Sequence, residues 1–107
     1  MASSMIQNQN KTWRPLSNDI TANGNYPMLA SLSNVTEIMI QLYYAGKIRY
    51  SVILTKYQLV AGYCFPDVTI SNERMYASIS VEGSNIVVSS FSKPSSWSSG
   101  AFVVLYR

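Results

Sequence analysis

Residues 37–55 alternate between apolar and polar side chains with a period of two, and this pattern constrains the fold more than any other feature of the chain. Successive side chains of a β-strand point to opposite faces of the sheet, so this period predicts two half-buried strands and argues against a helix. The segment Tyr44-Ala45-Gly46 interrupts the pattern and predicts the turn of a hairpin. The apolar face consists of Ile38, Ile40, Leu42, Ile48, Tyr50, Val52 and Leu54.

The length of this turn follows from the register that keeps apolar and polar side chains on separate faces of the hairpin. A two-residue turn would place Leu42 opposite Arg49, which mixes apolar and charged side chains on one face. A three-residue turn over residues 44–46 places Leu42 opposite Ile48, with Gly46 in a left-handed conformation. We therefore predict the three-residue turn, which also pairs Ile40 with Tyr50 and Ile38 with Val52.

Residues 75–91 predict a second hairpin, with a two-residue turn at Gly83-Ser84. This turn pairs Val81 with Ile86 and Ile79 with Val88, so the shorter turn preserves the faces here. Glycine at the first turn position suits a type II′ turn.

Short runs of β-branched and aromatic residues recur along the rest of the chain, and no window keeps a helical period over three turns. We predict an all-β fold: a small antiparallel β-sandwich with jelly-roll or Greek-key connections and little or no helix. A small closed barrel of the OB type is the alternative. The further expected strands are residues 19–23, 26–32, 57–63 and 101–106.

The chain has 107 residues, which fits a single domain. Residues 1–11 are polar and are expected to form a flexible lead or linker, and residues 12–107 the β-sandwich domain. Residues 1–4 are either native or an artificial addition before a natural start at Met5. We expect neither a signal peptide nor a membrane-spanning segment, because no apolar run has the required length.

Composition argues against catalysis. Histidine is absent and there is one cysteine, so a Ser-His-Asp triad, a histidine-containing metal site and a Cys-x-x-Cys centre are all excluded. We expect a protein that is not an enzyme, with no cofactor and no metal, and with Cys64 acting as a buried apolar side chain. The net charge is only +3 and its cations are scattered, so nucleic acid is not an expected partner.

Two loops carry aromatic residues that a core does not obviously need. Trp97 lies between two serines, where an indole can stack on a sugar ring while hydroxyl groups bind the sugar's OH groups. The alternative is that Trp97 folds back and fills the end of the sandwich. The candidate ligand-binding residues are Trp97, Ser96, Ser98, Lys93, Tyr63 and Phe65.

Association between copies of the chain is expected from its low charge and from its last strand. Only 12% of residues are charged, and residues 101–106 are apolar on both faces. A surface with so few charges tends to associate, and an oligomer would bury the second apolar face.

The polar lead, the domain rich in Ser, Asn and Tyr, and the closing stretch Ser99-Gly100-Ala101-Phe102-Val103-Val104-Leu105-Tyr106-Arg107 resemble the tip domains of bacteriophage tail fibres. Residues 20–26, Ile-Thr-Ala-Asn-Gly-Asn-Tyr, resemble the opening of such domains. The resemblance implies a homotrimer that is made in the host cytoplasm, carried on the virion, and recognises a bacterial surface glycan or an outer-membrane protein. It assigns no binding residue by position. The alternative function is a free carbohydrate-binding module or lectin.

Overall fold

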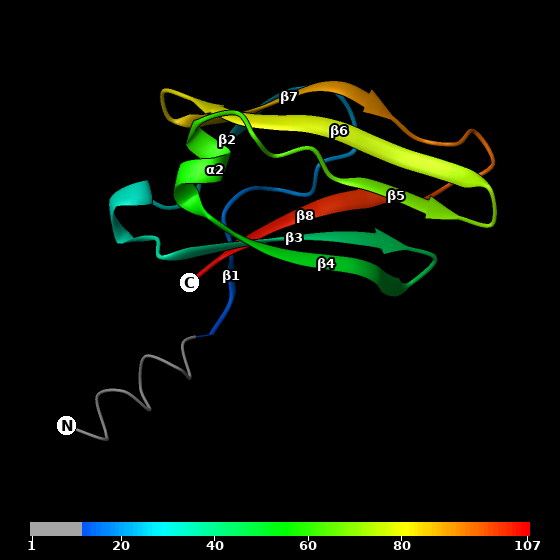
Figure 1. Cartoon of the computed structure of the whole chain (residues 1–107), viewed down its shortest axis with the longest axis horizontal. Helices are drawn as coiled ribbons and strands as arrows, with labels where there is room; N and C mark the ends of the chain where they lie inside the picture. The colour runs from blue at the N-terminus through cyan, green and yellow to red at the C-terminus, as the bar shows by residue number, and fades with distance from the viewer. Residues whose placement is uncertain (1–11) are drawn as a thin grey trace.

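The structure, a computed structural model, describes residues 12–107 and consists of two four-stranded antiparallel sheets packed face to face (Figure 1). The predicted lead, residues 1–11, lies outside the described residues. Sheet A has the order β1 (Arg14–Pro15), β8 (Ala101–Tyr106), β3 (Glu37–Tyr44) and β4 (Lys47–Thr55). Sheet B has the order β2 (Gly24–Pro27), β7 (Asn85–Ser92), β6 (Glu73–Glu82) and β5 (Asp67–Ile70). The predicted all-β sandwich is therefore confirmed.

The core lies between the sheets and is built from every second residue of the central strands, as the period of two requires. The strands β3 and β8 contribute from sheet A, and β6 and β7 from sheet B. The fully buried side chains of these strands are Ile38, Ile40, Leu42, Phe102, Val104, Met75, Ile79 and Ile86.

The first hairpin, β3–β4, forms where it was predicted, but its predicted register is wrong. The turn has two residues, Ala45 and Gly46, both with positive φ, and Leu42 lies opposite Tyr50. A β-bulge restores the faces, because Tyr43 pairs with Ile48 and leaves Arg49 as the extra residue. The bulge therefore keeps apolar and charged side chains on separate faces, which the prediction achieved with a longer turn.

The second hairpin, β6–β7, has the predicted register. Val81 lies opposite Ile86 and Ile79 opposite Val88. Gly83 has a φ of 61°, which a residue without a Cβ adopts at little cost.

The predicted strand at residues 57–63 is wrong, because the chain forms a short helix there, α2 (Lys56–Val60). Thr55 caps this helix: its hydroxyl oxygen accepts from the Gln58 N–H, and the Gln58 side chain accepts from the Thr55 N–H at 3.0 Å. This reciprocal capping box starts a helix at the end of β4 and sends the chain toward sheet B (Figure 1).

The predicted strands at residues 19–23 and 26–32 are also displaced. Ile20 makes only an isolated bridge to Phe102, and β2 covers Gly24–Pro27. Pro27 has no N–H to donate, which limits this strand. Residues beyond it form the short 3₁₀ helix η1 (Leu32–Asn34).

Strand β4 forms one edge of sheet A and strand β5 one edge of sheet B. No strand among residues 12–107 pairs with the outer side of β4, which is the longest of the four edge strands. The connection from β4 through α2 to β5 passes along this open side of the sandwich (Figure 1).

Candidate binding site

The loop that carries Trp97 closes one end of the sandwich. This agrees with the alternative prediction that Trp97 folds back and fills that end. The indole is 3% exposed and stacks on the Tyr44 ring, with 4.3 Å between ring centroids and 15° between planes. Its Nε1–H donates to Glu73 Oε1 at 3.2 Å. The indole is therefore a packed core side chain in this structure, with no open face for a ligand.

The neighbours of Trp97 support the same loop. The Ser96 hydroxyl donates to the second oxygen of the Glu73 carboxylate. Lys93 is half-buried with its aliphatic stem against Gly100, while Ser98 is exposed. The six candidate ligand-binding residues therefore do not form one site: Trp97, Ser96 and Lys93 take part in closing the loop.

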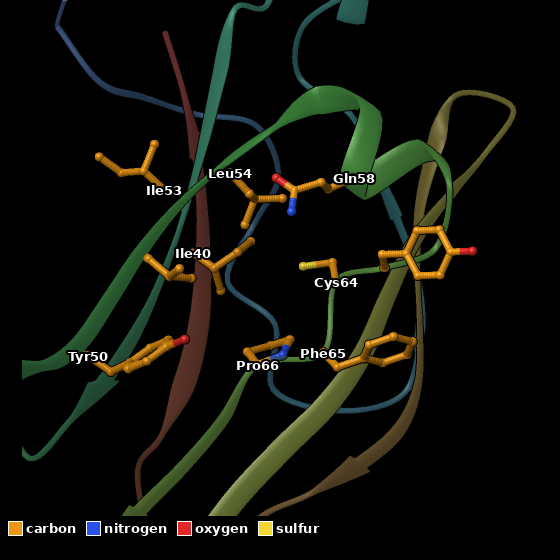
Figure 2. A pocket seen from close by; sticks show the side chains of 10 residues that line it. Ile40, Tyr50, Ile53, Leu54, Gln58, Cys64, Phe65 and Pro66 are labelled. Carbon is orange, nitrogen blue, oxygen red and sulfur yellow. The ribbon is translucent and has the colours of Figure 1, made fainter.

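Tyr63 and Phe65 occur in a different place and are strongly exposed, at 73% and 62%. They flank Cys64 in the segment between α2 and β5, where alternate side chains point outward and inward. With β4 they line a pocket of about 190 Å³ on the open side of the sandwich (Figure 2). The other lining residues are Ile40, Tyr50, Val52, Ile53, Leu54, Gln58, Cys64 and Pro66.

The pocket lies between sheet A and the segment that leads into β5. Figure 2 shows Ile40, Leu54 and Tyr50 on the sheet A side, opposite Cys64, Phe65 and Pro66. The backbone holds this segment in place, since the Cys64 carbonyl accepts from the Ile79 N–H at 2.9 Å. The pocket is therefore a gap between the two edges of the sandwich, with polar and apolar lining surface in nearly equal parts.

The polar groups of this pocket are suited to binding and poorly suited to nucleophilic attack. Burial raises the pKa of the Cys64 thiol to about 11, so the sulfur stays protonated at neutral pH. The Gln58 side-chain oxygen already accepts from the Thr55 N–H. The pocket therefore offers a ligand both apolar contact and polar groups, and Tyr50 and Tyr63 are among its lining residues.

Sequence reasoning missed the contribution of β4 to this pocket. Tyr50, Val52 and Leu54 were assigned to the core because their alternation is regular, yet all three are only half-buried. Their strand lies at an edge, and alternation alone does not distinguish an edge strand from a central one. The cue was the cluster Lys47 and Arg49, because charged side chains are common on edge strands.

Further apolar side chains are exposed on β4 and on α2, which follows β4 directly in the chain. We call them the edge surface. The edge surface consists of Ile48, Ile53, Tyr57 and Val60.

The chain matches no family model, no curated protein and no solved structure. Within residues 12–107, no helix has the length and apolar character needed to cross a membrane. The same residues contain no group of three or more Cys, Asp or Glu side chains placed to hold a metal ion.

Proposed function

We propose that this protein is a non-enzymatic structural or receptor-binding protein of a virus particle, of the bacteriophage tail-fibre-tip type, which acts as a homo-oligomer, with a trimer favoured. It would be made in the host cytoplasm, carried on the virion, and attach the particle to a bacterial surface glycan or an outer-membrane receptor. The observation that carries the proposal is the edge surface beside the unpaired outer side of β4.

Two physical properties of this region support association. Exposed apolar surface is common where proteins bind other molecules, and all four side chains of the edge surface are more than half exposed. An unpaired strand edge presents N–H and C=O groups that can pair with another strand, and natural monomers commonly shield such edges. Here Ile53 is exposed near the middle of the β4 edge strand, with no charge on either neighbouring residue.

The experiment combines oligomeric state with attachment. Sedimentation velocity of the full chain at several concentrations should give a stable trimer, and fluorescently labelled protein should bind a panel of bacterial cells in a saturable way. A concentration-independent monomer would overturn the oligomer, and an absence of saturable binding across the panel would overturn the attachment role.

A stand-alone carbohydrate-binding module or lectin is the second candidate. The exposed rings of Tyr63 and Phe65 beside a pocket favour it, because aromatic side chains with polar neighbours suit sugar recognition. A monomer that binds glycans would support this candidate over the first.

A further inference from the structure

A second pocket lies on the outer face of sheet B and shares Phe65 with the pocket of Figure 2. It has a volume of about 250 Å³. In β6 the residues Met75, Ala77 and Ile79 are buried, so the alternate residues Arg74, Tyr76 and Ser78 point away from the core. The side chains that define this pocket are Phe65, Asp67, Arg74, Tyr76, Ser78 and Ser90.

A rigid ion pair forms one side of this pocket. Arg74 Nε and Nη2 donate to the two carboxylate oxygens of Asp67, at 2.7 and 2.6 Å. The guanidinium carbon of Arg74 lies 4.3 Å from the centroid of the Tyr76 ring. A two-pronged bond and a stacked ring together restrict the Arg74 side chain, so its remaining N–H groups point in set directions.

The ion pair is electrically balanced and still open to solvent. The Arg74 and Asp67 side chains are 56% and 44% exposed. Hydrogen bonds from Arg74 lower the pKa of the Asp67 carboxyl, so the pair stays ionised at neutral pH. It therefore offers both N–H donors and carboxylate acceptors to a ligand, with no net charge to attract an ion.

Unusual backbone conformation marks the same place. Ser90 lines the pocket with a φ of 53°, in the left-handed region that non-glycine residues rarely adopt. It lies beside the β-bulge where the pairing of β6 and β7 shifts between Tyr76 and Ser78. Asn23 stabilises this bulge from β2's side of the sheet by accepting from the Phe91 N–H at 2.8 Å. Bulges and left-handed residues concentrate at binding sites, where they redirect side chains.

We infer that this pocket binds one ring of a neutral saccharide, with the Phe65 ring against the apolar face of the sugar and the Asp67–Arg74 pair on two neighbouring hydroxyls. Each sugar hydroxyl both donates and accepts, so it can donate to the Asp67 carboxylate and accept from an Arg74 N–H. Ser78 and Ser90 supply further hydroxyl groups. The volume lies just below the range of about 300–1,000 Å³ that is typical of larger ligands, which suits a single ring.

This inference deepens the proposed attachment function and rests on it for the expectation that the protein encounters glycans. The test uses ¹H–¹⁵N NMR titration of the full chain with glucose, galactose, mannose and N-acetylglucosamine, and with glucuronate as a charged comparison. At least one neutral sugar should give saturable shifts at residues 65, 67, 74, 76, 78 and 90.

Matched variants locate the site. Phe65→Ala should weaken binding about tenfold, whereas Tyr43→Ala, which removes an exposed ring on sheet A outside both pockets, should change binding less than about twofold. Arg74→Lys keeps the charge but loses the two-pronged bond and the stacking, and should also weaken binding about tenfold. Arg49→Lys is its control on sheet A.

The saccharide site is wrong if none of the four neutral sugars shifts these residues, if glucuronate binds more tightly than glucose, or if Phe65→Ala and Tyr43→Ala behave alike. Cell attachment of the same variants separates this failure from failure of the proposed function. Attachment by the native chain and by Phe65→Ala, together with no shift from any neutral sugar, overturns the saccharide site alone. Sugar binding in this pocket by a chain that attaches to no cell overturns the attachment function alone.

Discussion

Glu73 holds the Trp97 loop closed through a single carboxylate, which accepts from the indole N–H and from the Ser96 hydroxyl. A buried indole N–H without an acceptor would lose its hydrogen bond to water on folding, so this contact lowers the free-energy cost of burying Trp97. Tyr44, which stacks on the indole, comes from the far end of β3. The loop thus joins the ends of both sheets.

Burial of Trp97 has a spectroscopic consequence. The variant Trp13→Phe leaves Trp97 as the only tryptophan of the chain. Because this indole is 3% exposed, its fluorescence should be blue-shifted and only weakly quenched by iodide in the folded protein, and strongly quenched in urea. Strong quenching without urea would mean that the loop is open and that Trp97 is accessible to ligands after all.

The single thiol should make stability depend on alkaline pH. Burial raises the pKa of Cys64 from 9.0 to about 11, so the folded state keeps this proton over a range in which the unfolded state releases it. The free energy of unfolding should therefore be unaffected by this group below about pH 9 and should fall from there to about pH 11, by up to about 2–3 kcal/mol. Urea titrations at pH 8, 9, 10 and 11 measure this loss.

Cys64→Ala is the control for that measurement, because it removes the thiol and leaves every other ionisable side chain in place. The variant should lose less stability than the native chain between pH 9 and 11. Parallel pH profiles for the two proteins would show that the buried thiol does not contribute.

At the scale of elements, the β3–β4 turn combines Gly46, which suits its left-handed backbone conformation, with Ala45, which does not. Both turn positions have positive φ, 53° at Ala45 and 77° at Gly46. Glycine tolerates this conformation, whereas an alanine in it costs about 1–2 kcal/mol. Asn-Gly is the preferred pair for a two-residue turn of this kind.

Ala45→Asn should therefore stabilise the protein by about 0.5–1 kcal/mol, measured as the free energy of unfolding in urea. Ala61→Asn is the comparison, because Ala61 has a φ of −75° and gains nothing from asparagine's tolerance of left-handed backbone. Equal effects of the two substitutions would contradict the turn geometry.

The alternation of side chains predicted the long hairpins, because a strand with one buried face must repeat every two residues. The register of β6–β7 followed from Gly83 and Ser84, whereas the register of β3–β4 did not follow, because a bulge at Arg49 has no signature in the alternation. The prediction of a strand at residues 57–63 overlooked the capping box of Thr55 and Gln58.

The candidate site was predicted only in part, for a related reason. Tyr63 and Phe65 lie beside a pocket, but Trp97 does not, because its burial depends on Glu73 and Tyr44, which are remote in the chain. The pairing of Asp67 with Arg74 likewise arises from the β5–β6 register. Contacts between strands set these environments, and local sequence patterns do not contain them.

At the scale of the whole molecule, the open edge of β4 should govern association. Ile53→Lys places a charge in the middle of the edge surface, at a position that is already exposed in the isolated chain. It should leave the fold intact and weaken self-association about tenfold or more, because the charge would be buried in the interface. Sedimentation equilibrium measures the change.

Thr69→Lys adds the same charge on β5 in sheet B, away from the edge surface, and is the control. An oligomer that persists unchanged in Ile53→Lys, or one that both variants disrupt equally, would show that the interface lies elsewhere.

The position of β8 has a consequence for how the protein is made. This strand follows the other seven in the chain, yet it lies between β1 and β3, and its Phe102 forms the bridge to Ile20. A nascent chain that has emerged from the ribosome only as far as β7 can form both hairpins, but β1 has no neighbour and one edge of β3 has no pairing partner. Sheet A is completed only after residues 101–106 emerge, so closure of the sandwich is a late step that pairs segments from opposite ends of the domain.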